Sequence, residues 1–408
     1  MRSWPPTVVP ELPGRAPSLR VFDTASGQIR PTAPGERARM YVCGITPYDA
    51  THIGHAATYI LFDTVNRIWR DGGHDVDYTQ NVTDVDDPLL ERAVESGEDW
   101  RGLADRETEA FRADMEALRV IPPRNYIGAV ESIPWIVDSI LELKQMRAAY
   151  EVDGDLYFPV GVAPRFGEVS GLPRREMMRL FAERGGDPQR EGKRDPLDAL
   201  LWRSARDGEP SWRSALGRGR PGWHVECSSI ASVMPGVPLD IQGGGSDLSF
   251  PHHEMCAAMA EAGSGAWPFA RHYLHVGMVG YQGEKMSKSR GNLVFVRSLL
   301  DGGADPSAIR LAILAHHYQT DWEWTPEDLA RAQDRLTAWR LGAEARKAPS
   351  GAALLQRLRE CLSDNLSTDS ALAAVDDWVT QARLGRGPDA DAPTLVRAAV
   401  DALLGVVI

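Results

Sequence analysis

The hydrophobic pattern near the start of the chain predicts a strand, a helix and a second strand in succession. The run 38–43 is short and apolar and is followed by Gly44, which is typical of a buried strand. Apolar residues then recur at helical spacing over 60–69, and we expect this helix to end at Gly72. Residues 74–78 alternate like a strand. Such a unit belongs to parallel sheets, which bind ligands at the carboxyl ends of their strands.

The rest of the pattern predicts an α/β protein. It has a Rossmann-like parallel-sheet nucleotide-binding domain in two halves, an inserted connective region and an all-α C-terminal region. Proline-rich residues 1–35 are expected to form a loop, and strand signals return near 239–241 and 274–276. Residues 325–328 are typical of a capped helix start. The predicted helices of the last region are 307–318, 326–346, 352–362, 369–384 and a closing helix within 388–408. The predicted parts are 1–125 for the first half of the nucleotide-binding domain, 126–205 for an insertion of helices and loops, 206–305 for the second half, and 306–408 for the helical region.

The composition is that of a globular protein and excludes several classes. The 408 residues are 43% hydrophobic and 25% charged, which excludes wholesale disorder. No apolar run approaches the roughly 18–20 residues of a membrane helix, and the N-terminus lacks the apolar stretch of a secretory signal. We therefore expect a cytoplasmic protein without membrane contact. With 45 basic and 57 acidic residues, a net charge of −12, the chain is a poor general binder of polyanions.

The chain has four cysteines, Cys43, Cys227, Cys256 and Cys361. This content is far below that of a disulfide-stapled scaffold, so we expect a reducing compartment. Cysteines in such a protein are candidates for metal binding or catalysis, or else small buried hydrophobic residues. Cys361 falls in a predicted helix of the C-terminal region and is expected to be structural.

Two short motifs predict a site for a nucleoside triphosphate. His52-Ile53-Gly54-His55 lies between the first strand and the first helix. Glycine there allows close approach to the backbone, the helix end is positive, and the two rings can donate hydrogen bonds to phosphate. Lys285-Met286-Ser287-Lys288-Ser289 follows the strand signal near 274–279. Only five of the 45 basic residues are lysine, and two of them stand in this pentapeptide, as expected for a loop that closes on a triphosphate.

Together with four further segments, these motifs resemble the class I aminoacyl-tRNA synthetases, and specifically the cysteinyl-tRNA synthetase family. The resemblance spans about residues 38–320, and the segments that carry it are 41–55, 81–87, 222–228, 243–248, 250–254 and 285–289. It implies the class I synthetase fold and attack of a cysteine carboxylate on the α-phosphate of Mg²⁺-bound ATP, which gives cysteinyl adenylate and pyrophosphate. His52 and His55 would stabilise the charge on the phosphates, and Lys285 and Lys288 would hold the leaving pyrophosphate.

The resemblance also implies one zinc ion per chain that binds the thiolate of the substrate. Cys43, Cys227 and His252 match the ligands of the family, and three protein ligands leave a fourth position open. Zinc prefers a thiolate to a hydroxyl group, so the metal would select cysteine over serine. Cys256 stands where many family members carry a glutamate ligand. Two readings of Cys256 stay open, a fourth ligand in the resting enzyme or a packed neighbour of the site.

Further site residues follow from the resemblance. Thr46, Thr58 and Trp223 would line the amino-acid pocket, although Trp223 could also be a core aromatic residue. Asp247 would bind ribose, and the backbone of Met278-Val279 would bind adenine. The full predicted set for substrate and adenylate is Cys43, Gly44, Ile45, Thr46, Thr58, Asn81, Val82, Thr83, Trp223, Gly245, Ser246, Asp247 and Val279. The histidines assigned to packing or to the surface are His224, His253, His272, His275, His316 and His317.

The acceptor of the activated cysteine is a separate question. Residues 291–408 hold 12 basic and 16 acidic residues, a net charge of −4, and 119 residues follow Ser289, which argues against tRNA. One branch of the family, the cysteine ligases of mycothiol biosynthesis, joins cysteine to the amine of glucosaminyl-inositol and releases AMP. The chain is similar to this branch in the segments 45–47, 56–58, 86–88 and 183–188.

This resemblance implies a monomer whose partners are L-cysteine, ATP and glucosaminyl-inositol, with no tRNA. Two alternatives stay open. One is a cysteinyl-tRNA synthetase with a shortened C-terminus, and the other is an inactive relative that senses cysteine or a nucleotide. The intact histidine motif, lysine motif and metal ligands argue against the inactive relative.

Overall fold

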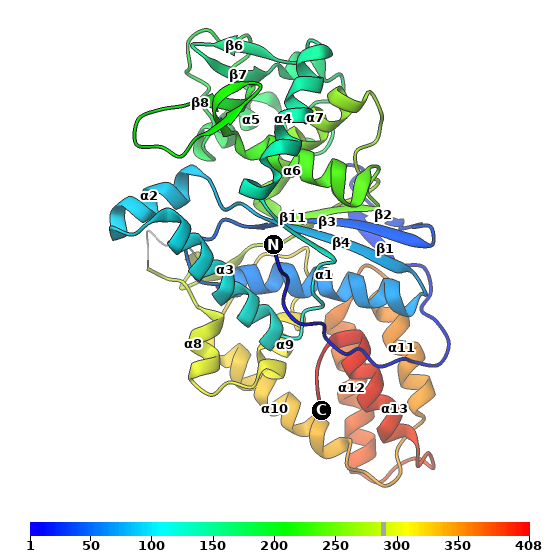
Figure 1. Ribbon diagram of the computed structural model, residues 1–408. Coiled ribbons are helices and arrows are strands. Elements are labelled where there is room, and N and C mark those ends of the chain that lie inside the picture. The colour runs from blue at the N-terminus through cyan, green and yellow to red at the C-terminus, as the bar shows by residue number, and fades with distance from the viewer. Residues whose placement is uncertain (287–290) are drawn as a thin grey trace.

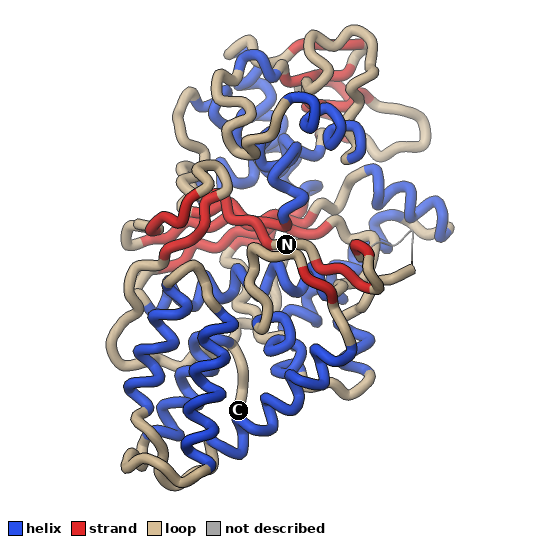
Figure 2. Tube along the Cα trace, turned by 180° about the vertical axis from the view of Figure 1, so that it is seen from behind, coloured by secondary structure: helices blue, strands red, loops and turns tan. Residues whose placement is uncertain are grey.

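The centre of the molecule is a five-stranded parallel sheet with the strand order β12-β11-β3-β4-β5. The computed structural model describes residues 1–286 and 291–408. Figures 1 and 2 show the sheet in the middle of the molecule with helices on both of its faces, which confirms the predicted Rossmann-like α/β class. The strands are β3 (Arg37–Ile45), β4 (Asp75–Val82), β5 (Asn125–Gly128), β11 (Ile241–Gly245) and β12 (Tyr273–Val276).

The predicted strand–helix–strand unit is present as β3, α1 (Ile53–Asp71) and β4, and α1 ends at Gly72 as expected. β3 has β4 on one side and β11 on the other. The chain therefore continues from β3 to β4 on one side of β3, and it later returns as β11 on the other side of β3. Open parallel sheets bind ligands beyond the carboxyl ends of the strands at such a point.

Between β5 and β11 the chain builds a second, antiparallel sheet with the order β6-β7-β8-β10-β9, in the upper part of Figure 1. The expectation of helices and loops over 126–205 was wrong. β7 is buried along its whole length, so it lacks the alternation of polar and apolar residues that reveals a strand. The boundary at residue 205 stays a prediction, and this sheet runs across it. Its elements are α4 (Ala129–Gln145), β6 (Tyr150–Val152), β7 (Asp155–Phe158), α5 (Arg174–Glu183), β8 (Ala199–Ser204), β9 (Trp212–Ser214) and β10 (Gly217–Pro221).

Helices cover the two faces of the central sheet. α6 (Trp223–Ala231) and α7 (Glu254–Ser264) pack against each other on one face, and α1 lies on the other (Figure 1). α2 (Asp87–Ser96) and α3 (Trp100–Ala117) connect β4 to β5.

The chain after residue 305 is mainly helical, as predicted. α9 and α13 pack on α1, on the side away from the sheet (Figure 1). α10 begins with the expected capping box between Thr325 and Asp328. The helices of this part are α9 (Pro306–Leu314), α10 (Pro326–Gly342), α11 (Gly351–Ser363), α12 (Thr368–Arg383) and α13 (Ala392–Leu404), and the short helix α8 (Val296–Asp301) comes just before them.

A buried ion cluster ties these helices to α1. Asp63 on α1 accepts a hydrogen bond from Arg67 Nε at 2.7 Å and pairs with Arg310 of α9, and all three side chains are buried. Arg67 also donates to the carbonyl of Asp401 in α13 at 2.9 Å. Burial by itself would raise the pKa of Asp63, but the guanidinium groups of Arg310 and Arg67 outweigh this and lower the pKa below its ordinary value. The helical region therefore shares one core with the nucleotide-binding domain.

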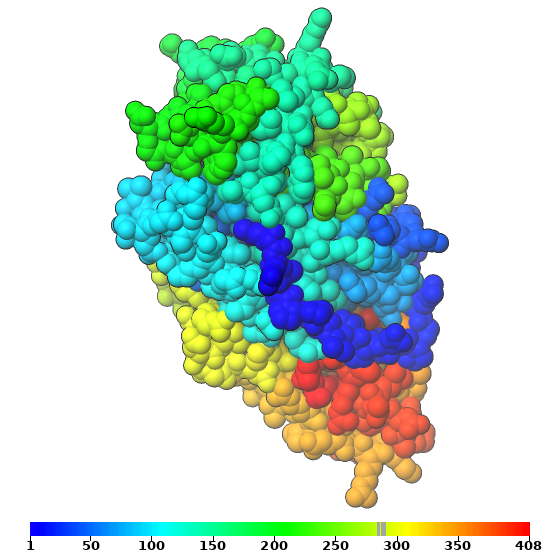
Figure 3. Space-filling model, viewed as in Figure 1, coloured from blue at the N-terminus to red at the C-terminus, as the bar shows by residue number. Residues whose placement is uncertain are grey.

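The N-terminal segment 1–35, which was predicted to be a loop, contains regular secondary structure. It contains the hairpin of β1 (Arg20–Asp23) and β2 (Gln28–Pro31), whose strands are only four residues long and so left little pattern to detect. Figure 3 shows the residues before the hairpin lying across the surface of the molecule. Trp4 anchors them, because its Nε1 donates to the carbonyl of Val120 at 2.7 Å.

A small sheet carries the beginning of the lysine motif. β13 (Val279–Tyr281) pairs antiparallel with β14 (Glu284–Lys285) and parallel with β15 (Trp322–Glu323). The predicted site residue Lys288 lies outside the described residues, and the side chain of Lys285 does too. In the described part of the chain, no helix has the length and apolar character needed to span a membrane.

Candidate active site and metal centre

A cavity of about 410 Å³ opens beyond the carboxyl ends of the central strands. The first turn of α1 and the start of α6 complete its walls. Most predicted site residues line it, namely Cys43, Gly44, Ile45, Thr46, His52, His55, Thr58, Asn81, Thr83, Trp223, Cys227, Gly245, Asp247, His252, Met278 and Val279. Gly54 of the histidine motif lines it as well, and the lining residues that sequence reasoning did not assign to the site are Tyr48, Asp49, Tyr59, Leu248, Val276, Gly277, Met286 and Leu293.

The two histidines of the first motif stand at the N-terminus of α1. His52 is the N-cap residue, and its Nδ1 accepts a hydrogen bond from the Gly54 amide at 3.1 Å. The rings of His52 and His55 stack with their centroids 3.8 Å apart. Burial lowers the pKa of His55 to about 4, so this ring is neutral near pH 7. Two imidazoles beside the positive end of a helix suit a phosphate group.

A bulge at the end of β3 shapes the wall of the cavity. The register of β3 and β4 shifts between Val42 and Ile45. Asn81 Oδ1 accepts hydrogen bonds from the Gly44 amide at 2.8 Å and from the Tyr41 hydroxyl at 3.1 Å. A Cβ atom on residue 44 would lie 1.5 Å from the carbonyl oxygen of Asn81, so the close approach of the two strands requires glycine.

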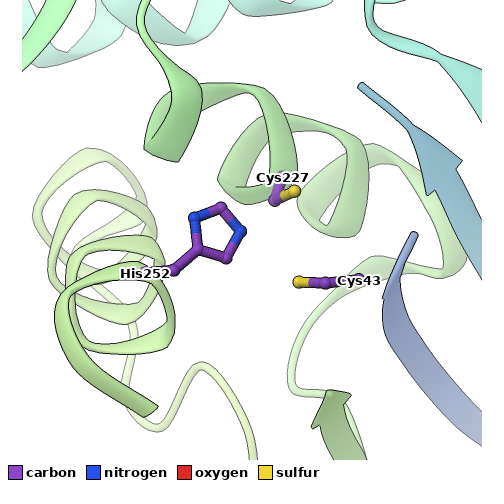
Figure 4. Close-up of side chains that lie close together, drawn as sticks. All are labelled: Cys43, Cys227 and His252. Carbon is purple, nitrogen blue, oxygen red and sulfur yellow. The ribbon is translucent and has the colours of Figure 1, made fainter. Parts of the chain in front are cut away.

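Cys43 of β3, Cys227 of α6 and His252, just before α7, converge in one place, as Figure 4 shows. Their ligand atoms all lie within 4.8 Å of one another, and all three residues are buried. Burial raises the pKa of the Cys43 thiol. Burial has the same effect on Cys227, but the Cys43 thiol and His252 outweigh it and lower the pKa of Cys227. Two sulfur atoms and one imidazole nitrogen at this spacing fit a metal ion, and three ligands leave one position open.

Three histidines that were assigned to packing or to the surface are buried, which agrees with packing, and two of them, His224 and His253, contact residues of this cluster. His224 Nδ1 lies 3.0 Å from His252 Nδ1. His253 Nε2 lies 3.2 Å from Cys43 Sγ, and His253 Nδ1 lies 2.8 Å from His275 Nε2. The position of His253 next to a predicted ligand was the only signal in the sequence.

Trp223 and Cys256 are the two residues with alternative readings. The Trp223 ring lines the cavity and stacks on the His252 ring, with centroids 4.3 Å apart at 20°. Cys256 Sγ lies 3.9 Å from His252 Nε2, donates to the carbonyl of His224 at 3.3 Å and is not part of the cluster of possible ligands. The geometry therefore favours a pocket role for Trp223 and a packed-neighbour role for Cys256.

Some predicted contacts do not reach the cavity among the described residues. Val82 is buried within β4, and Ser246 is also absent from the cavity lining. The Met278 amide donates to Asp321 Oδ1 at 2.7 Å, and its carbonyl accepts from the Trp322 amide at 3.1 Å. Met278 does line the cavity, but these bonds already pair its amide and its carbonyl, and the contact of the Met278-Val279 backbone with adenine stays a prediction.

The loop 183–188 reaches the site from the inserted region. Arg184 follows α5, and its Nη1 donates to the carbonyls of Asp247 and Phe250. These two hydrogen bonds stabilise the turn between β11 and His252. No pattern in the sequence predicted this contact of Arg184.

Comparisons with known proteins agree with this geometry. The family model described as tRNA synthetases class I (C) catalytic domain matches residues 30–334. The chain is 61% identical over the full length of both chains to L-cysteine:1D-myo-inositol 2-amino-2-deoxy-alpha-D-glucopyranoside ligase of Thermomonospora curvata. It is 59% identical to the ligase of the same name from Thermobifida fusca, over all of this chain and 98% of the relative.

A solved structure supports the fold. Methionyl-tRNA synthetase of Mycobacterium tuberculosis in complex with methionyl-adenylate superposes with a TM-score of 0.66 at 16% identity, covering 90% of this chain and 92% of that one. The chain therefore belongs to the class I tRNA synthetase (C) family and, within it, to the L-cysteine:1D-myo-inositol 2-amino-2-deoxy-alpha-D-glucopyranoside ligases.

Proposed function

We propose that the chain activates L-cysteine with ATP and transfers it to the amine of glucosaminyl-inositol, a step of mycothiol biosynthesis. One observation carries the proposal. A single cavity joins the Cys43–Cys227–His252 cluster to the histidine pair at the start of α1. An amino acid held at the cluster and a nucleotide held at the helix would meet inside it. The names of the relatives give the two compounds that would be joined, L-cysteine and the amino sugar.

The reaction has two steps. A carboxylate oxygen of cysteine attacks the α-phosphorus of ATP, a C–O–P linkage forms, and the bond to the β-phosphate breaks to release pyrophosphate. The amine of the sugar then attacks the carbonyl carbon, the C–O bond to phosphate breaks, AMP leaves, and the amine nitrogen loses a proton. The product is an amide.

His52 and His55 would donate hydrogen bonds to the phosphate oxygens in the first step. Lys285 and Lys288 would hold the pyrophosphate as it leaves. Donors that are in place before the reaction stabilise developing charge without reorganisation, and each is worth on the order of 10²–10³ in rate. Mg²⁺ would accompany ATP.

We propose zinc as the metal at Cys43, Cys227 and His252. Two buried thiols and one imidazole are ligands that zinc prefers. Bound there, zinc would offer its open position to the substrate thiolate and so distinguish cysteine from serine. The three protein side chains come from three different parts of the fold, and a metal held by them would fix the place of the amino acid relative to α1.

The remaining cavity residues would position the substrates. Thr46, Thr58 and Trp223 would surround the amino group of cysteine. Gly44, Ile45, Asn81 and Thr83 would follow the adenylate along the ends of β3 and β4. Gly245 and Asp247 would contact the ribose, and the Val279 backbone the adenine.

The acceptor distinguishes this proposal from its alternative, a cysteinyl-tRNA synthetase. Phosphate contacts from basic side chains provide most of the affinity for tRNA. Residues 291–408 carry a net charge of −4 from 12 basic and 16 acidic residues, which suits a small neutral or cationic acceptor better.

All four cysteines are free, and we propose a monomer in the reducing cytoplasm.

One assay tests the proposal. Purified protein should exchange pyrophosphate into ATP when cysteine is present, and should then form cysteinyl-glucosaminyl-inositol with release of AMP. The same preparation should leave tRNA uncharged. Efficient charging of tRNA without any product from the amino sugar would favour the synthetase, and absence of cysteine-dependent exchange would overturn both.

A further inference from the structure

Two buried histidines that the proposed reaction does not use form a line of hydrogen bonds that ends on a metal-ligand candidate. His253 Nε2 lies 3.2 Å from Cys43 Sγ, and His253 Nδ1 lies 2.8 Å from His275 Nε2. His275 Nδ1 in turn lies 2.7 Å from Thr24 Oγ1, at the end of β1. Each of the four ring nitrogens therefore has a partner within hydrogen-bond distance.

The fold makes room for this arrangement. His253 is 0% exposed and His275 is 9% exposed. Gly244 of β11 pairs with His275 of β12, and a Cβ atom on Gly244 would lie 3.3 Å from His253 Nε2 and 2.8 Å from a methyl group of Leu248. A larger residue at this position would press on the edge of the ring that faces Cys43. The hydrogen bond to His275 thus holds one end of the His253 ring, and the absence of a side chain at Gly244 leaves room for the ring.

Only one distribution of protons suits a Cys43 thiolate that binds a metal. A thiolate has no proton and can only accept, so His253 Nε2 must be the donor. The neutral ring then has an acceptor at Nδ1, which requires a proton on His275 Nε2. His275 Nδ1 becomes an acceptor, and the Thr24 hydroxyl can donate to it. Each hydrogen bond in the line sets the direction of the next.

We propose that His253 is a positioning residue of the metal site, which holds the Cys43 thiolate through an N–H···S hydrogen bond oriented by His275 and Thr24. This inference rests on the metal site of the proposed function. His253 contacts Cys43 and is not among the residues that line the cavity, so it acts through Cys43. Groups that hydrogen-bond to metal ligands typically contribute about 10- to 100-fold in metal affinity.

The test compares zinc affinity among variants of the whole protein, measured by competition with a chromophoric chelator at one pH. His253→Leu removes the donor and should weaken zinc binding by about 10- to 100-fold. His253→Gln keeps an N–H donor and should recover most of the affinity. His272→Leu is the matched control, because His272 is also buried but donates to the carbonyl of Asp240, outside the line. It should bind zinc like the wild type.

A second readout follows the thiolate directly. In the cobalt-substituted protein, the sulfur-to-cobalt absorption band should shift in His253→Leu and not in His272→Leu. Unchanged affinity and an unchanged band in folded His253→Leu would overturn the positioning role, as would equal losses in the Leu and Gln variants. If His253→Leu does not fold, Thr24→Val decides, since it removes only the hydroxyl at the far end of the line. It should weaken zinc binding less than tenfold but measurably, and wild-type affinity would overturn the inference. A wild-type protein that binds no metal would instead remove the proposed metal site itself.

Discussion

His52 and Phe295 form an antiparallel bridge that joins the two motifs of the nucleotide site. On either side of it, the Ile53 amide donates to the Val294 carbonyl and the Val296 amide donates to the Thr51 carbonyl, both at 2.9 Å. The segment that follows the lysine motif is therefore held by backbone hydrogen bonds against the N-terminus of α1. The position of one motif depends on the position of the other.

This bridge can be weakened without breaking a helix. Val296 is the first residue of α8, a position that accepts proline. Val296→Pro removes the amide that donates to Thr51, whereas Val296→Ala keeps the amide and removes two buried methyl groups, more apolar contact than the Pro variant loses. We expect pyrophosphate exchange to fall by about 5- to 100-fold more in the Pro variant, because small displacements of catalytic groups are costly. Equal rates in the two variants would show that the bridge has no role in catalysis.

The metal cluster predicts a graded response to serine substitutions. Cys43→Ser and Cys227→Ser should lose bound zinc and cysteine activation, because a hydroxyl is a poor replacement for a thiolate ligand. Cys256→Ser should be milder, since Cys256 lies outside the cluster. Cys361→Ser, in α11, serves as the control. Metal analysis of the purified variants checks this, and full zinc content with normal activity in the Cys43 or Cys227 variant would refute the ligand assignment.

Gly44 should not tolerate a side chain. Gly44→Ala would place a Cβ atom 1.5 Å from the Asn81 carbonyl oxygen and force β3 away from β4. We expect a loss of about 3 kcal/mol in the free energy of unfolding, at the upper end of what overpacking typically costs, together with loss of pyrophosphate exchange. Gly102→Ala is the control, because a Cβ atom there meets nothing within 4 Å and alanine favours the helix α3. Denaturant unfolding of both variants gives the comparison, and similar stability for the two would contradict the tight approach.

We expect the buried ion cluster to contribute more to the free energy of unfolding than a surface ion pair does. Arg310→Met leaves Asp63 buried with one partner fewer, which should lower the free energy of unfolding by about 3–5 kcal/mol. Arg340→Met, which breaks a pair with Asp305 whose side chains are 45% and 34% exposed, should cost about 0–1 kcal/mol. Urea unfolding at pH 7 measures both, and equal midpoints would be evidence against the cluster.

The same cluster gives a direction for the pH dependence. The pKa of Asp63 is lowered in the folded protein, so its ionised form contributes stability above the pKa of an unfolded aspartate, about 3.9. That contribution is lost as the pH falls through the folded pKa. Asp63→Asn should therefore show a flatter loss of stability below about pH 4 than the wild type, and parallel curves would contradict this.

Much of the nucleotide site could be predicted because its signals are local. The apolar run before Gly44, the helical spacing after His55 and the stop at Gly72 each occupy a few consecutive residues, and β3, α1 and β4 appear where they were expected. The C-terminal helices α9 to α13 were found for the same reason. The strands of the second sheet were not, because β7 is buried throughout and shows no alternation.

The sequence by itself determined the chemistry that is available: two histidines at the start of a helix, two lysines in one motif, and cysteines with a histidine that suit a metal. The tertiary structure decided which of these meet. It placed the ligand atoms of Cys43, Cys227 and His252 within 4.8 Å of one another. It also brought His253 into hydrogen-bond distance of Cys43 and paired His52 with Phe295. Such contacts link residues far apart in the chain, and their energy depends on the packing of whole elements. No periodic pattern in the sequence records them, so they could be seen only in the folded molecule.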